Sequence, residues 1–240
     1  IWAGLVIIGF SFGMNNERTA AAIGATLGHS QAHHRAFIED PQPRSVLSEA
    51  DIEELETTLD AQNFVTGFAK RTVLQGMVAS PKKTRATRII GVDAEAERRV
   101  TTITSYMIEG DFFESKTRKG VVISEKLAKK MGLGMRKKLV LTFQDQRGII
   151  HKATFRVSGI YRTLNAAWDE LNLYVQQGDI ERIVGGSLIH EVLISYDKSE
   201  DTEKKTQAIV SKINGPTIVT SWKKNSPELG FADDMMGIML

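Results

Sequence analysis

The chain has 240 residues, of which 42% are hydrophobic and 25% charged, so it can bury the core of one large domain or two small ones, and disorder is excluded. The 31 Lys and Arg residues against 29 Asp and Glu residues leave a formal charge of +2, too small to attract nucleic acid over the whole surface. Zero cysteines exclude disulfides, thiolate metal sites, iron–sulfur clusters and cysteine nucleophiles.

Both ends of the sequence are apolar. Residues 1–16 carry no charge and predict the outer end of a first transmembrane helix, which needs ~20 apolar residues and would be completed upstream. A secretory signal and a buried core helix are the alternatives. The chain turns apolar again after Asp234, so residues 227–240 predict the approach to a second transmembrane helix. The polar body between the two ends is then expected to stand outside the membrane.

The first part of the body predicts strand, helix and hairpin. A short strand is expected over residues 28–34, and a helix over residues 48–60, where Ser48 can cap with Asp51 and the apolar residues follow helical spacing. Residues 65–78 and 84–92 predict two extended strands joined by a basic turn. Together they indicate a β-hairpin.

The pattern changes after residue 108. A buried strand at residues 120–123, a helix at 125–131 ended by Gly132, and strands at 138–143, 154–161 and 171–175 predict a compact, strand-rich insert. The earlier pattern then returns, with strands expected at residues 191–196 and 217–222 around a helix at 202–213.

We therefore expect an α+β fold in which a discontinuous βαβ domain is interrupted by a second subdomain. The expected divisions are residues 17–107 and 185–226 for the two parts of the discontinuous domain and 108–184 for the insert. Two strand–helix–strand units can share one sheet with their helices on one face.

Local motifs that could carry chemistry have plainer interpretations. Residues 9–13 match the G-x-S-x-G elbow of serine hydrolases around Ser11, but they lie inside the apolar run rather than at a strand-to-helix turn. His29, His33 and His34 suggest a metal pair, yet no nearby carboxylate completes the ligands, so polar residues of an edge strand are favoured. The acidic residues of 53–56 fit a solvated helix face. We expect no catalytic, cofactor-binding or metal-binding residues.

Two basic runs fit solvated faces or, as a second interpretation, contacts with anionic lipid headgroups. They contain Lys82, Lys83, Arg85 and Arg88, and Lys126, Lys129, Lys130, Arg136, Lys137 and Lys138. Neither run is interleaved with aromatic residues, which argues against nucleic acid as a partner. No G-x-x-x-x-G-K-[ST] loop occurs, so ATP hydrolysis is not expected in this chain.

Several segments together resemble the periplasmic core domain of MacB-like and LolC/LolE-like ABC transporter permeases of the FtsX superfamily. The similarity covers residues 28–222 and is most specific over residues 120–133. The matching segments are Gly28 to His33, Glu109 to Phe113, Gly120 to Leu133, Lys138 to Phe143, Phe155 to Ile160, Asp169 and Glu170, and Leu173 to Val175.

The resemblance implies a domain between the first two transmembrane helices, with a discontinuous porter-like part and an inserted sabre-like part. It implies a dimer of permeases in the bacterial inner membrane, with this domain in the periplasm and ATP hydrolysed by a separate ATPase subunit. Mechanotransmission to a periplasmic cargo or partner protein would serve lipoprotein release, efflux or control of that partner. A lipid- or membrane-anchored extracytoplasmic binding module without transport activity is the alternative.

Two loops are the candidate partner contacts. LolC-like members present a long hairpin loop to a lipoprotein carrier, but the corresponding connection here, residues 144–151, is short, which argues against carrier capture. The candidate contacts are Gln146, Arg147 and Ile149 in this connection, and Leu164 and Trp168 in the next loop. Ile149 and Trp168 would anchor a partner if exposed and belong to the core if buried, and core is the favoured interpretation for Trp168.

Overall fold

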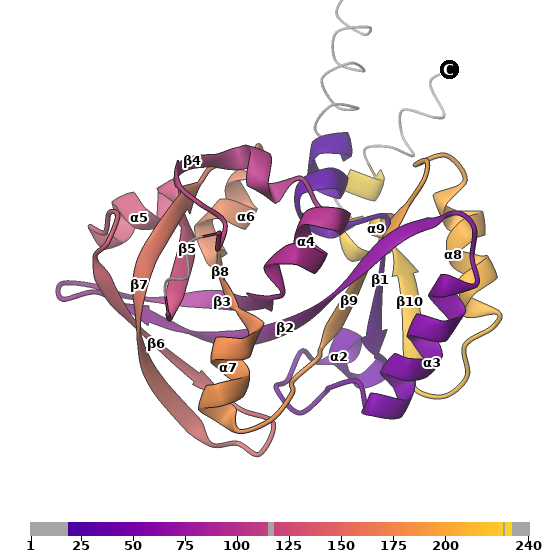
Figure 1. Ribbon diagram of the computed structural model, residues 1–240, viewed down its shortest axis with the longest axis horizontal. Coiled ribbons are helices and arrows are strands. Elements are labelled where there is room, and N and C mark those ends of the chain that lie inside the picture. The colour runs from indigo at the N-terminus through magenta and orange to yellow at the C-terminus, as the bar shows by residue number, and fades with distance from the viewer. Residues whose placement is uncertain (1–18, 115–117, 228, 232–240) are drawn as a thin grey trace, which may run out of the picture.

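A computed structural model describes residues 19–114, 118–227 and 229–231 (Figure 1). The prediction for residues 1–16 lies outside the described residues, as does most of 227–240. Among the described residues, no helix combines the length and apolar character needed to cross a bilayer.

The first elements that the structure describes are a short π-helix and a strand, and the first amphipathic helix follows them. These elements are η1 (Ile23–Leu27), β1 (Ser30–His34), α2 (Arg35–Glu39) and α3 (Glu49–Asp60). Ser48 and Asp51 form the expected capping box, in which the Asp51 amide donates to Ser48 Oγ and the Ser48 amide donates to Asp51. Leu55 and Leu59 are fully buried, as the helical spacing predicts.

The expected hairpin is present, and two short helical segments follow it. The elements are β2 (Val65–Ala79), β3 (Thr84–Val92), α4 (Ala94–Val100) and η2 (Ile103–Tyr106). Asp93 caps α4 by accepting a hydrogen bond from the Ala96 amide. Helix α4 was not predicted because its seven residues, AEAERRV, are mostly polar and too few to show a helical repeat of apolar residues.

The middle of the chain is rich in strands, as expected, but holds three helices rather than one. Its elements are β4 (Met107–Gly110), β5 (Gly120–Ser124), α5 (Glu125–Met131), β6 (Lys138–Gln144), β7 (Ile150–Tyr161), α6 (Ala166–Leu171), β8 (Asn172–Gln176) and α7 (Gln177–Val184). The last elements are β9 (Glu191–Tyr196), α8 (Thr202–Val210), β10 (Thr217–Ser221) and α9 (Trp222–Asn225).

The ten strands of the described residues belong to one sheet. Its order is β10-β1-β9-β2-β3-β8-β5-β7-β4, and β6 pairs with both β2 and β7. The two βαβ units therefore share one sheet, and α3 and α8 lie side by side on the right in Figure 1, where they pack on a common apolar cluster. The expected α+β class is confirmed.

Part of this sheet closes into a barrel, which the sequence did not predict. Strands β2, β3, β8, β5, β7 and β6 pair in turn, and β6 returns to β2. The largest apolar cluster fills the barrel with residues from every one of these strands. The ring closes at Gly76, where a Cβ would lie 2.6 Å from the Thr142 carbonyl oxygen, so only glycine fits. The β2–β3 hairpin thus completes a barrel with strands from the predicted insert.

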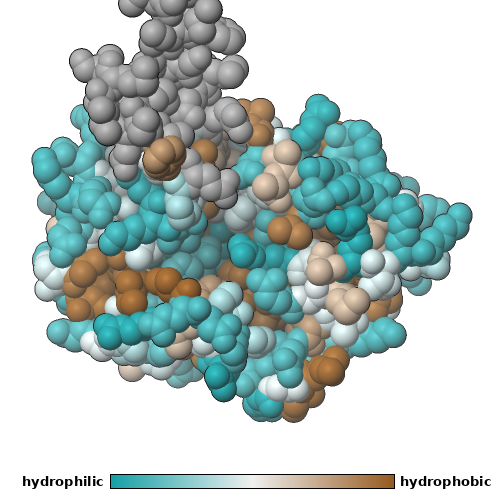
Figure 2. All heavy atoms as spheres, turned by 180° about the vertical axis from the view of Figure 1, so that it is seen from behind, coloured by the Kyte–Doolittle hydropathy of each residue, from teal (hydrophilic) through white to brown (hydrophobic). Residues whose placement is uncertain are grey.

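The reverse face of the molecule carries no continuous apolar band. Figure 2 shows it as mainly hydrophilic, with hydrophobic side chains gathered in separate patches. Large exposed apolar side chains in the described residues include Ile149, Ile150 and Leu164.

Candidate functional site

The described chain begins and ends at one face, which we call the chain-end face and define by η1 and α9. Strand β1 follows η1, and β10 precedes α9. The two strands are antiparallel neighbours, with Ser30 paired to Ser221, so η1 and α9 lie together at the top of Figure 1. The Trp222 amide donates to the His29 carbonyl at 3.0 Å and holds α9 against the start of β1.

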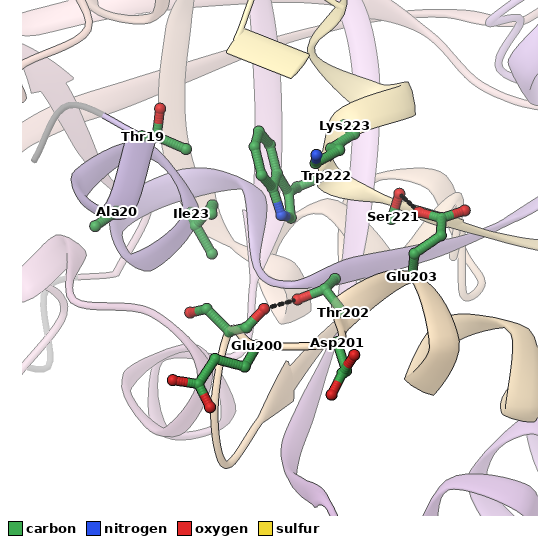
Figure 3. A pocket seen from close by; sticks show the side chains of 11 residues that line it. Thr19, Ala20, Ile23, Glu200, Asp201, Thr202, Glu203, Ser221, Trp222 and Lys223 are labelled. Atoms are coloured by element: carbon green, nitrogen blue, oxygen red, sulfur yellow. Dashed lines mark hydrogen bonds between the residues drawn. The ribbon is translucent and has the colours of Figure 1, made fainter. Parts of the chain in front are cut away.

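A cavity of about 610 Å³ opens at the chain-end face (Figure 3). Trp222 and Ile23 form one side, and the loop that leads into α8 forms the other. Ser221 donates to Glu203 at 2.6 Å, whereas Asp201 pairs with Lys204 at 2.8 Å. The hydrogen bond from Lys204 lowers the pKa of Asp201. The cavity therefore lies between η1 and α9 on one side and the loop before α8 on the other.

A buried charge cluster lies beneath η1 and is centred on Arg71. The Arg71 side chain is 1% exposed and Glu97 is fully buried. Arg71 Nε donates to Glu97 Oε2 at 3.0 Å and Nη2 donates to Glu97 Oε1, while Nη1 donates to Glu191 Oε1 at 3.0 Å. Burial alone would lower the pKa of Arg71, but Glu97 and Glu191 raise it, so the guanidinium stays charged.

The same guanidinium also holds η1. Arg71 Nη1 donates to the Thr26 carbonyl at 3.0 Å, and the Thr102 amide donates to the Gly24 carbonyl at 2.7 Å. We call Arg71, Glu97, Glu191 and Thr26 the Arg71 joint. In β2, Arg71 is the residue where pairing with β9 ends and pairing with β3 begins. The Arg71 joint therefore links the first described helix to both halves of the molecule.

The turn between β6 and β7 carries the first group of predicted contacts. It lies at the bottom of Figure 1, opposite the chain-end face. Gln146 and Arg147 are exposed, and Ile149 and Ile150 are 48% and 71% exposed. Asp145 organises the turn by accepting hydrogen bonds from the amides of Arg147 and Ile149 at 2.8 and 3.0 Å.

Asp145 also binds side chains of the turn. His151 Nε2 and Arg147 Nη2 lie 3.0 and 2.9 Å from Asp145 Oδ2. Burial alone would raise the pKa of Asp145, but hydrogen bonds from His151, the Ile149 amide and Arg147 lower it far below its usual range. Arg147 Nη2 also donates to the Val184 carbonyl at 2.9 Å. A short connection is thus held in one conformation.

The second group of predicted contacts lies elsewhere. Leu164 is 63% exposed and lines a small cavity with Ala22 of the segment before η1 and with Ser226 after α9, so it belongs to the chain-end face. Trp168 is half-buried and packs against the apolar cluster that includes Tyr161 and Tyr174. The structure does not bring the two predicted loops together.

The predicted histidines are engaged with protein groups. His29 Nδ1 accepts from the Tyr196 amide at 3.0 Å, and His34 Nδ1 accepts from the Ala36 amide at 3.2 Å. His33 lies 3.2 Å from both the His190 carbonyl and Gln31 Oε1. The edge-strand interpretation was wrong, because β1 is paired on both sides, by β10 and β9. No grouping of metal-ligating side chains occurs in the described parts of the chain, and Ser11 lies outside them.

The two basic runs meet in part. Lys126 and Lys130 of α5 and Arg85 of β3 all pair with Glu170. Hydrogen bonds from Lys130 and Lys126 lower the pKa of Glu170 to about 2. The chain after α5 turns away from this cluster, so the second run is divided between two surfaces.

The Arg71 joint was missed by sequence reasoning. Arg71 stands in an otherwise ordinary strand, and its acidic partners follow 26 and 120 residues later. The only local signal was that Arg71 alternates with Ala69 and Val73, the apolar residues two positions before and after it, and this signal does not identify its acidic partners.

The geometry defines an α+β domain of the kind that can be inserted into another structure through a single face. The family model described as the MacB-like periplasmic core domain matches residues 1–212. The chain belongs to this family, and it is therefore a periplasmic domain of the type found in MacB-like ABC transporter permeases.

Two solved structures share the fold. The periplasmic region of MacB from Actinobacillus actinomycetemcomitans has a TM-score of 0.54 at 16% identity, covering 85% of this chain and 93% of that one. The extracellular domain of the noncanonic ABC-type transporter YknZ from Gram-positive bacteria has a TM-score of 0.51 at 12% identity, covering 80% and 98%. No curated protein sequence matches the chain.

Proposed function

We propose that this domain transmits conformational change between a cytoplasmic ATPase subunit and a periplasmic cargo or partner protein. The permease would lie in the bacterial inner membrane as a dimer, with the residues flanking the chain-end face continuing into membrane helices. The transmitted movement would serve lipoprotein release, efflux or control of a partner. In this proposal, residues 17–107 and 185–226 form the porter-like part and residues 108–184 the sabre-like part, which the β2–β3 hairpin joins in the barrel.

The Arg71 joint carries the proposal. A displacement of η1 acts directly on Thr26, and the guanidinium passes it to β2 and, through the two carboxylates, to α4 and β9. A packed interior deforms little, so such a displacement moves whole elements rather than being absorbed locally.

Association with an ATPase tests this function. The full-length permease is purified together with its candidate ATP-binding subunit and placed in nanodiscs. A stable complex that hydrolyses ATP is expected. A permease that neither binds the ATPase nor changes its rate would instead identify an anchored binding module without transport activity.

The two exposed loops are expected to contact different surroundings. We propose that Ile149, with Gln146 and Arg147, faces the periplasmic partner, whereas Leu164 faces the rest of the permease beside the membrane. Photo-crosslinking residues at Ile149 and Leu164 are compared in cells with one at Ile108, which is similarly exposed at 43% on β4. Crosslinks from Ile149 to a periplasmic protein and from Leu164 within the permease support the assignment. Equal crosslinking at Ile149 and Ile108 contradicts it.

A further inference from the structure

A basic hollow on the outside of the barrel is not explained by the proposed function. It has a volume of about 330 Å³ and is lined by Arg118, Lys119, Lys138 and Arg156, with Thr154 and Phe155. Three chain segments meet there, namely the approach to β5, the start of β6 and the middle of β7.

The backbone fixes these segments beside one another. The Arg156 amide donates to the Lys119 carbonyl at 2.9 Å, and the Val157 amide donates to the Lys137 carbonyl at 2.9 Å. Arg156 also donates from Nη1 to the Arg136 carbonyl at 3.3 Å. Arg136 and Lys137 therefore border the hollow, and we call these six cations the barrel cations: Arg118, Lys119, Arg136, Lys137, Lys138 and Arg156.

The barrel cations lack acidic partners in the part of the chain that the structure describes. The lysines of α5, by contrast, are neutralised by carboxylates: Lys126 and Lys130 pair with Glu170, and Lys129 pairs with Glu125. The nearby carboxylate Asp179 is buried and already accepts hydrogen bonds from the Lys119 amide and from Arg182. The hollow therefore presents uncompensated positive charge.

This arrangement is unfavourable for the isolated domain. Lys138 of β6 stands directly opposite Arg156 of β7, and like charges in such a cross-strand pair repel. Lys119 and Arg136 have φ angles of 54° and 63°, in the left-handed region that non-glycine side chains rarely occupy. Both the repulsion and the backbone strain occur where the cations converge.

We propose that the barrel cations bind an acidic segment of a partner protein. Lys119 directly precedes β5, Arg156 lies in β7 and Lys138 in β6. These three strands are adjacent, so at ~4.8 Å per strand the positive charge is spread over about 10 Å. A single phosphate group is too small to span this distance. An extended peptide places side chains on one face every ~6.6 Å, so its carboxylates reach separate cations. Figure 1 places β6 and β7 to the side, away from η1 and α9, which favours a soluble partner over lipid headgroups.

The test measures binding of a fluorescent hexaglutamate peptide to the 240-residue chain by anisotropy. The double variant K138Q/R156Q is compared with K82Q/K198Q, which removes two exposed cations from other surfaces. We expect about tenfold weaker binding for K138Q/R156Q only, since each exposed ion pair contributes modestly. The Lys138 side chain has no hydrogen bond or ion pair among the described residues, so K138Q alone carries the test if the double variant fails to fold.

A second readout is thermal unfolding without peptide. Relief of the repulsion predicts that K138Q raises the Tm by about 1–2 °C at low salt, with the gain disappearing at high salt. Equal loss of peptide binding in both double variants, or no binding by the original chain, would overturn the proposal. So would binding of phosphatidylglycerol vesicles or inorganic phosphate at the barrel cations without binding of the peptide.

Discussion

Arg71 is kept in the interior by two carboxylates, and each of these charges depends on the other for its burial. Removing one member of a buried ion pair leaves the remaining charge without solvent or partner, which is strongly destabilising. Replacing both members with apolar side chains of similar size avoids that penalty. The double replacement therefore removes the link between η1 and the sheet while most of the stability of the fold is kept.

We expect R71M to lower the free energy of unfolding by about 3–5 kcal/mol, measured by urea denaturation, because Glu97 stays buried and unpaired. The double variant R71M/E97M should recover most of this loss. The control is K70M, which removes a partly exposed Lys–Glu56 pair worth no more than about 1 kcal/mol. An equal loss of unfolding free energy in R71M and K70M would show that the buried ion pair is not needed for stability.

His190 predicts how stability changes with pH. Its Nδ1 accepts from the Val73 amide at 3.2 Å and its Nε2 lies 3.0 Å from the Pro43 carbonyl, which fits a neutral ring. Burial lowers the pKa of His190 to about 4. The unfolded chain therefore takes up this proton first as pH falls, and stability is lost between about pH 6.5 and 4.

The H190Q variant should lose less stability than the original chain between pH 7 and pH 5, because glutamine can keep both hydrogen bonds and does not titrate. The measurement is urea denaturation at pH 7, 6 and 5. Burial also lowers the pKa values of His29 and His33, so the free energy of unfolding of H190Q still falls with decreasing pH, but less steeply. If the free energy of unfolding falls equally steeply with decreasing pH in both proteins, His190 does not cause the loss of stability.

At the scale of the elements, local patterns predicted most strands and the helices with clear caps. The helix at 49–60 matches because Ser48 and Asp51 signal its start and Leu55 and Leu59 its buried face. The helix predicted over residues 202–213 ends at Val210. Ser211 is its C-cap, and a turn follows. Short helices such as α7 span too few residues for a helical repeat of apolar residues to be recognised in the sequence.

Long-range pairing could not be predicted in the same way. The parallel alignment of β3 with β8 and the contact of β2 with β6 join residues far apart in sequence. The Arg71 joint depends on the same long-range arrangement. Division of the chain at residues 107/108 and 184/185 stays a prediction, and closing the barrel needs the β2–β3 hairpin from outside the insert.

Limited proteolysis tests this division. The connections at residues 101–108 and 185–188 are the expected early cleavage sites. The structure favours the second, because Gly185 and Gly186 are exposed whereas Ile103 is fully buried. Residues 121–131 should resist cleavage, since they form buried β5 and the helix packed behind it. Early cleavage inside that segment would contradict the assignment.

At the scale of the whole molecule, the chain-end face and the β6–β7 turn lie at opposite ends. A body joined by one sheet and a filled barrel can carry a movement from the first to the second without internal rearrangement. We therefore expect nucleotide binding at the ATPase to move the β6–β7 turn.

The most direct measurement is the distance between spin labels at Gln146→Cys in the two permeases of the assembled transporter. Pulsed electron paramagnetic resonance compares the nucleotide-free state with a state trapped on ATP by a hydrolysis-deficient ATPase. We predict a shift of the distance distribution between the two nucleotide states, and we expect this shift to be lost in R71M/E97M although that variant remains folded. Identical distributions in both nucleotide states, with the ATPase bound, would contradict mechanotransmission by this domain.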